Sequence, residues 1–106
     1  MLDKKLAGLL GLAAKAGAIK SGELSGEDAI RHGKACYVLI AADASENTVK
    51  KFSNMCCFHK VSFQIYGTKE TLGQAIGRDW RSVICICDSS FANACAGKLK
   101  TAGEDK

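Results

Sequence analysis

The fold is decided by one stretch of the chain, which reads YVLIAADAS at residues 37–45. Its first five residues form a continuous apolar run of β-forming side chains, which is typical of a strand covered on both faces. Ser45 is a favourable residue for starting a helix, because its side-chain oxygen can accept a hydrogen bond from a backbone N–H of the first turn. The stretch therefore predicts a buried strand that leads into a helix of residues 46–58.

The same alternation continues toward the N-terminus. Residues Leu2–Ala16 carry leucine and alanine at helical spacing and are followed by Gly17, a natural helix stop. Residues 18–20 predict a short strand. Ser21 and Gly22 then open a second predicted helix, which runs to about His32.

Toward the C-terminus we expect strand, helix, strand and helix at residues 61–66, 68–76, 82–87 and 89–97. Asp88 is expected to cap the last helix, and residues 98–106 are expected to form a frayed tail. Alternation of this kind predicts an α/β fold whose sheet carries helices on both faces. The whole chain, residues 1–106, is expected to form a single domain.

Composition limits the classes of protein. The 106 residues are 47% hydrophobic and 25% charged, which excludes wholesale disorder, and the net charge of +4 permits a polyanionic partner without identifying one. No apolar run approaches the ~18 residues that a membrane span needs. The N-terminal residues lead into an amphipathic segment and not a signal peptide, so we expect a cytoplasmic protein with six reduced cysteines.

Four blocks of the chain have an order and spacing that resemble a known family: SG at 21–22, AIRHGKA at 29–35, VLIAADAS at 38–45 and GTKETLGQAIG at 67–77. The family comprises the ribosomal proteins L-seven-Ae and L-thirty-e with their bacterial relatives. The resemblance covers about Leu6–Ala94. It implies a three-layer α/β/α sandwich with a mixed four-stranded sheet, and binding to kink-turns or related bends of structured RNA in a ribosome or ribonucleoprotein.

The resemblance also implies an RNA-binding face made of three segments, residues 20–28, 43–45 and 77–82. The residues carried over to it are Lys20, Ser21, Gly22, Glu23, Leu24, Ser25, Asp28, Asp43, Ser45, Arg78, Trp80 and Arg81.

One motif departs from the family pattern. Archetypal members read Gly-x-Asn-Glu-x-x-Lys at the second helix, whereas this chain reads GELSGED at residues 22–28 and places Leu24, Ser25 and Asp28 at the Asn, Glu and Lys positions. A glutamate can accept hydrogen bonds from a guanine edge and a lysine can donate to guanine. Ser25 is short and Asp28 has the opposite charge. A protein-interaction module that has lost standard kink-turn recognition therefore stays open as the alternative.

The loop GRDWRS at residues 77–82 carries two arginines and the only tryptophan. Arginine pairs with phosphate or guanine, and tryptophan can stack on an unpaired base. The competing interpretation is that Trp80 covers the end of the core while both arginines are solvated. The turn formed by Lys20, Ser21 and Gly22 also has two interpretations. It is either a phosphate-binding site at the start of a helix or a simple turn in which Ser21 caps the helix.

Catalytic and metal sites are less well supported. Asp43 and Asp88 follow strands, where open α/β sheets often hold catalytic carboxylates, but no nucleophile, base and metal set accompanies them, so we expect them to cap the helices that follow. The cysteine pairs lack the two-residue gaps of a zinc site, so we expect them to serve packing. We expect no enzymatic activity, no cofactor, no metal and no small-molecule substrate.

Overall fold

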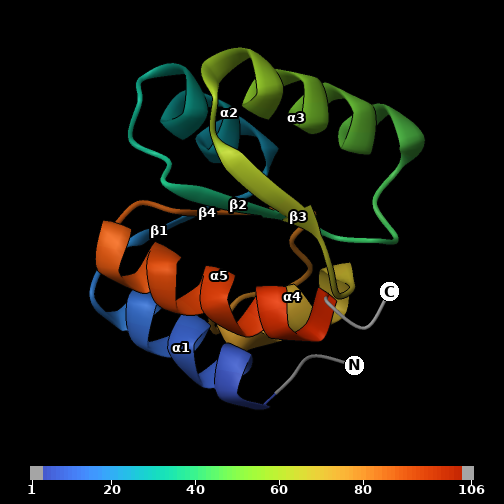
Figure 1. Cartoon of the computed structure of the whole chain (residues 1–106). Coiled ribbons are helices and arrows are strands. Elements are labelled where there is room, and N and C mark those ends of the chain that lie inside the picture. Colours follow the sequence, from blue (N-terminus) through green and yellow to red (C-terminus); the bar gives the residue numbers. More distant parts are fainter. Residues whose placement is uncertain (1–3, 104–106) are drawn as a thin grey trace.

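The computed structural model describes residues 4–103, in which helices and strands alternate as the sequence predicts (Figure 1). The elements are α1 (Lys4–Lys15), β1 (Ile19–Ser21), α2 (Glu23–Arg31), β2 (Tyr37–Ile40), α3 (Glu46–His59), β3 (Ser62–Ile65), α4 (Lys69–Ala75), β4 (Val83–Ile86) and α5 (Ser89–Gly103). The predicted start of the first helix at Leu2 lies outside the described residues.

The four strands form one mixed sheet in the order β1-β4-β2-β3. Strand β4 pairs antiparallel with both β1 and β2, whereas β2 and β3 are parallel. The central strands β2 and β4 are buried along their whole length, which explains why their sequences are continuous apolar runs.

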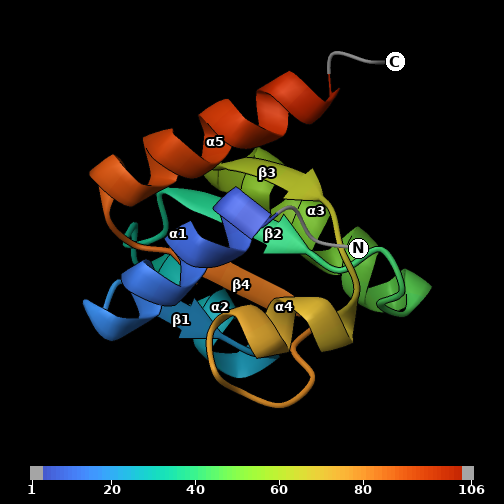
Figure 2. The same cartoon turned by 90° about the horizontal axis from the view of Figure 1, so that it is seen from below.

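Helices cover both faces of the sheet, so the three-layer α/β/α sandwich is confirmed (Figures 1 and 2). Successive residues of a strand point to opposite faces. Tyr37 and Leu39 accordingly pack with α1, α4 and α5, whereas Val38 and Ile40 pack with α2 and α3. Among the described residues, no helix combines the length and the apolar character that a membrane crossing requires.

Side-chain caps fix the starts of three helices. Ser45 accepts a hydrogen bond from Thr48 N at 3.2 Å, and Asp88 accepts one from Phe91 N at 3.1 Å, both as predicted. The prediction for Asp43 was wrong, because its carboxylate accepts from Lys69 N at 2.8 Å and thereby caps α4 instead of the next helix. The parallel pairing of β2 and β3 brings the loops after both strands to the same edge of the sheet.

The last helix is longer than predicted. It continues past Gly97 to Gly103, although residues from 98 onward were expected to be frayed. Ala92, Cys95 and Leu99 recur at helical spacing and are buried in the cluster beneath α5. This tertiary packing outweighs the helix-weakening effect of Gly97, which is of the order of 1 kcal/mol. Residues 104–106 of the predicted tail lie outside the described part.

All six cysteines are free thiols. Cys56, Cys85 and Cys95 are buried in the core, whereas Cys36 and Cys57 are exposed. Burial, with a smaller contribution from neighbouring cysteines, raises the pKa of the Cys56 thiol to about 11 and that of Cys85 to about 12. Because the thiolate is the reactive form, both burial and the raised pKa protect the core cysteines.

Thiol labelling should separate two adjacent residues. We expect iodoacetamide at pH 8 to modify Cys57 in the native protein and to leave Cys56 unmodified, because only the first is exposed. Mass spectrometry of tryptic and chymotryptic peptides gives the site occupancy. Protein unfolded in guanidinium, in which both residues react, is the control. Equal native labelling of the two residues would show that the described packing of α3 is wrong.

Candidate nucleic-acid interface

The first turn of α2 and the loop that follows α4 lie next to each other although they are far apart in the sequence. They are joined because β1, which precedes α2, pairs with β4, which follows the loop. The pairing continues past the strand ends, since Gly22 N donates to the Val83 carbonyl at 2.9 Å. Figure 2 shows the loop projecting beside α2. Two of the three predicted segments are therefore brought together.

A shallow groove runs between these two segments, and we name it the arginine groove. Its lining residues are Ser21, Gly22, Glu23, Leu24, Ser25, Trp80, Arg81 and Ser82. Gly22 occupies the N-cap position with φ of 91°, a conformation that favours glycine. No side chain caps α2 there. The alternative role of Ser21 as a cap was therefore wrong, and the first turn of α2 begins without a side-chain cap for its backbone N–H groups.

Arg81 links both walls of this groove. Its Nε donates to Ser21 Oγ at 3.1 Å, and one terminal nitrogen donates to the Trp80 carbonyl at 3.0 Å. Its backbone N–H donates to the Lys69 carbonyl at 3.0 Å. The guanidinium is half-buried and held in one orientation, with donors left over for a ligand.

Trp80 is 64% exposed, so the alternative that it covers the end of the core was wrong. The ammonium of Lys69 lies 5.5 Å from the centre of the indole ring. This contact has the geometry of a cation–π interaction, which holds an exposed ring in place. An exposed tryptophan anchored in this way offers a flat surface on which an unpaired base can stack.

Gly73 in α4 sets the position of the loop. Its carbonyl accepts from Arg78 N at 2.8 Å, and a Cβ atom at this position would overlap the carbonyl of Asp79. The loop therefore packs directly on helix backbone, which only glycine allows. Gly73 lies within the GTKETLGQAIG block at residues 67–77, but its structural role was not predicted from the sequence. A glycine inside a predicted helix was the available signal.

The acidic residues of α2 are occupied by partners. Glu23 accepts from Thr48 Oγ1 at 3.0 Å. Glu27 lies 2.7 Å from Arg31 and 2.9 Å from Lys51, and the hydrogen bond from Lys51, aided by both positive charges, lowers its pKa. Asp28 lies 3.0 Å from Nδ1 of His32. Glu23 and Glu27 are thus directed toward α3 and basic side chains, which limits their repulsion of a polyanion in the groove.

The remaining predicted residues do not line the arginine groove, although Ser45 is linked to Glu23 through Thr48. Asp43 and Ser45 serve as helix caps and do not line the arginine groove. Arg78 is exposed on the loop outside it. Lys20 and Asp28 line a second groove on the other side of α2, together with Lys34, which sequence reasoning did not single out.

The lining of the arginine groove suits binding better than catalysis. Its serine hydroxyls have no histidine or cysteine among the lining residues, and the carboxylate of Glu23 is engaged by Thr48. Within residues 4–103, no group of three or more histidine, cysteine, aspartate and glutamate residues could hold a metal ion. Cationic, aromatic and backbone donor groups that converge in an open groove are those that contact phosphates and bases.

The fold and the groove define a small α/β/α protein with a loop-and-helix binding surface. The chain belongs to the Ribosomal protein L7Ae/L30e/S12e/Gadd45 family, which it matches over residues 4–96. The family resemblance of the sequence is thereby confirmed.

Two bacterial proteins are among the relatives of this chain. The chain is 40% identical over 85 residues to RNA-binding protein YlxQ of Bacillus subtilis, covering 80% of this chain and 85% of that protein. It is 39% identical over 90 residues to RNA-binding protein YlxQ of Enterococcus faecium, covering 84% of this chain and 85% of that protein.

Solved structures that share the fold include the following two. A protein of unknown function from Bacillus halodurans C has a TM-score of 0.86 at 33% identity, over 90% of this chain and 96% of that one. The Giardia lamblia 15.5kD RNA binding protein has a TM-score of 0.78 at 25% identity, over 95% of this chain and 92% of that one.

The Gly73→Ala substitution should displace the loop. We expect it to lower the free energy of unfolding by about 1–3 kcal/mol, the usual cost of overpacking, because the new Cβ has no room beside Asp79. Gly8→Ala is the matched control: nothing lies within 4 Å of its Cβ position, so we expect up to about 1 kcal/mol of stabilisation. Urea unfolding measures both changes. Equal effects of the two substitutions would contradict the described contact.

Proposed function

We propose that this chain binds bent, structured RNA of the kink-turn kind, as a non-catalytic, cytoplasmic component of the ribosome or another ribonucleoprotein. The observation that carries the proposal is the convergence of Arg81, exposed Trp80 and the uncapped first turn of α2 in one groove. Relatives named as RNA-binding proteins support it.

Each part of the groove has a separate role in this proposal. Trp80 stacks on a base that the bend leaves unpaired. Arg81 presents its remaining N–H groups to phosphate or to a guanine edge. The first turn of α2 supplies backbone donors, and its partial positive charge favours phosphate. Arg78 adds a solvent-exposed cation to the electrostatic footprint.

Recognition in this proposal depends on shape more than on side-chain reading of bases. Leu24 is 86% exposed at the tip of the first turn, and an apolar side chain there can pack on a base or sugar but cannot read a hydrogen-bonding edge. Ser25 and Asp28 occupy the other two positions where the family pattern has long polar side chains. Backbone donors and the Trp80–Arg81 wall therefore have to supply the discrimination.

Binding to a standard kink-turn RNA tests the proposal. We expect tight binding that weakens steeply between two salt concentrations, because phosphate contacts release counterions. The control RNA has the sheared G·A pairs of the kink-turn replaced, and we expect it to bind clearly more weakly in fluorescence anisotropy. Equal affinity for both RNAs would reduce the function to general phosphate binding, and no binding to either would overturn the proposal.

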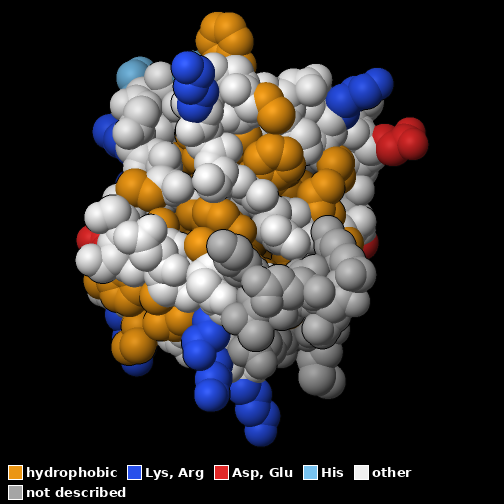
Figure 3. Space-filling view, viewed as in Figure 1, with side chains coloured by type: hydrophobic (Ala, Val, Ile, Leu, Met, Phe, Trp, Pro, Cys, Tyr) orange, Lys and Arg blue, Asp and Glu red, His pale blue; other side chains and the backbone are white. Residues whose placement is uncertain are grey.

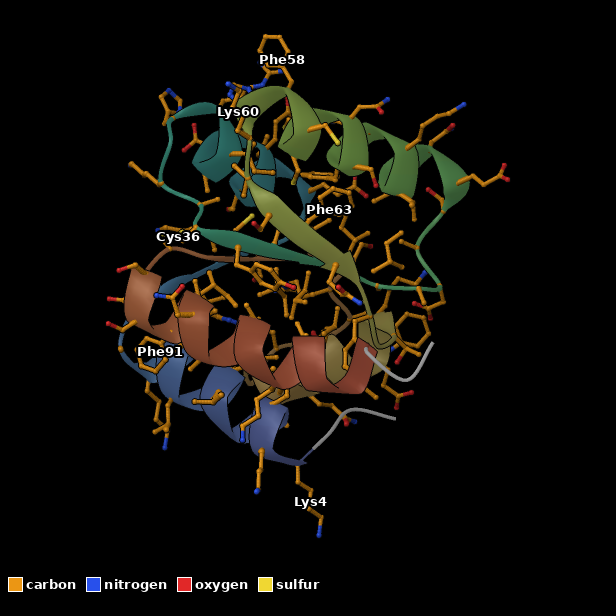
Figure 4. The ribbon with its side chains drawn as sticks, in the orientation of Figure 1. Lys4, Cys36, Phe58, Lys60, Phe63 and Phe91 are labelled. Atoms are coloured by element: carbon orange, nitrogen blue, oxygen red, sulfur yellow. The ribbon has the colours of Figure 1, made fainter. Side chains whose placement is uncertain are left out.

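Trp80→Ala tests the stacking role. Base stacking on an aromatic side chain contributes roughly 1–3 kcal/mol, so we expect the Kd for the kink-turn RNA to rise by about 5- to 150-fold. Phe58→Ala is the matched control, since Phe58 is 81% exposed and projects from the far end of α3 (Figure 4). Thermal unfolding confirms that both variants are folded. The stacking role is rejected when both substitutions change the Kd equally.

Contact with a protein partner is the second candidate function. The observation that favours it is β3, an edge strand without a charged residue, whereas exposed edges usually carry charges that prevent pairing. Ile65 on β3 is 45% exposed, and hydrophobic side chains gather on this face, with Lys and Arg toward its periphery (Figure 3). This function would be favoured by two results together: the chain does not bind kink-turn RNA, and it retains a protein partner in a pull-down after nuclease treatment.

A further inference from the structure

The first turn of α2 separates two grooves. The arginine groove lies on one side, and on the other lies a groove lined by Lys20, Leu24, Ser25, Asp28, Ala29 and Lys34, which we name the lysine groove. Both grooves share Leu24 and Ser25. Leu24 is therefore an exposed apolar ridge between two grooves, each of which contains at least one cationic side chain.

The two lysines come from different elements and are available to a ligand. Lys20 lies on β1, and Lys34 lies in the loop between α2 and β2; both are exposed. No ion pair among the described residues involves either of them. The groove also contains the carboxylate of Asp28, which lies 3.0 Å from Nδ1 of His32. Two cations thus face one carboxylate that has a partner of its own.

Lys34 is held in place by the way α2 ends. Gly33 has φ of 70°, its N–H donates to the Ile30 carbonyl at 3.3 Å, and Lys34 N donates to the Ala29 carbonyl at 2.9 Å. These two bonds form a Schellman motif, which fixes the chain just beyond a helix. The backbone of Lys34 is therefore ordered before any ligand binds, and its side chain starts from the rim of the groove.

We propose that the lysine groove is a second phosphate-binding track, in which Lys20 and Lys34 contact the sugar–phosphate backbone of the helical arm on the far side of the RNA bend. This inference rests on the proposed function. A bent RNA presents two helical arms that diverge from one point, and the two grooves diverge from one ridge. Leu24 lies at the bend, the arginine groove receives the nucleotides at the bend and the near arm, and the lysine groove receives the far arm.

The test compares two double variants that remove the same charge. Lys20→Gln with Lys34→Gln removes the proposed contacts. Lys4→Gln with Lys98→Gln is the matched control, because α1 and α5 lie on the opposite face of the sheet from α2 (Figure 1). A plot of log Kd against log salt concentration has a slope that increases by about 0.9 for each phosphate of duplex nucleic acid that the protein contacts. We expect the first variant to lose about 1.8 of slope and the control to lose none.

Shortening the RNA locates the contact. Kink-turn RNAs are made with either helical arm cut back close to the bend. We expect the difference between the lysine-groove variant and the control to vanish when one arm is shortened and to persist when the other is shortened. The second track would be overturned if the difference in Kd between the lysine-groove variant and the control variant were the same with both shortened RNAs. It would also be overturned if the two variants bound the full-length RNA equally.

The two possible failures are distinguishable. If the unmodified protein prefers the kink-turn RNA to the G·A-replaced control but the two double variants behave alike, the proposed function stands and the second track is wrong. If the unmodified protein shows no such preference, the proposed function fails and the second track fails with it.

Discussion

The antiparallel pairing of β1 with β4 is the constraint on which the binding surface depends. It places the segment that enters α2 beside the segment that leaves the loop after α4, and the bond from Gly22 N–H to the Val83 carbonyl extends it to the groove itself. Gly26 continues the same close approach, because a Cβ there would lie 3.2 Å from Cγ1 of Val83. A larger residue at position 26 would therefore require Val83 or α2 to shift by a few tenths of an ångström.

Electrostatics at this surface follows from pairing more than from composition. The segment from Glu23 to Asp28 contains three carboxylates, which by count alone would repel RNA. Thr48 holds Glu23, and Arg31 and Lys51 hold Glu27, so these charges serve the packing of α2 on α3. Lys20 and Lys34, which form no ion pair among the described residues, border the lysine groove. The net charge of a segment is thus a poor guide to the electrostatic potential at the surface where a ligand binds.

Local patterns were sufficient to predict most of the fold. The apolar runs of β2 and β4 and the capping residues Ser45 and Asp88 each signal their own conformation through short-range physics. The failures depended on contacts between distant segments. Leu99 extends α5 because a core lies beneath it, and Asp43 caps α4 because parallel strands end at the same edge. Trp80 is exposed on a loop that packs on α4 at Gly73, and Lys69 lies over its ring. The lysine groove could not be foreseen either, since its two lysines are separated by the whole of α2.

Lys69 joins three parts of the molecule at a single residue. Its backbone N–H is held by Asp43, its carbonyl accepts from Arg81, and its ammonium lies over Trp80. The loop is thus ordered when the protein folds, and little conformational entropy remains to be lost when a ligand arrives. A surface prepared in this way associates at rates set by diffusion and charge, so that different ligands are distinguished chiefly by how long each one stays bound.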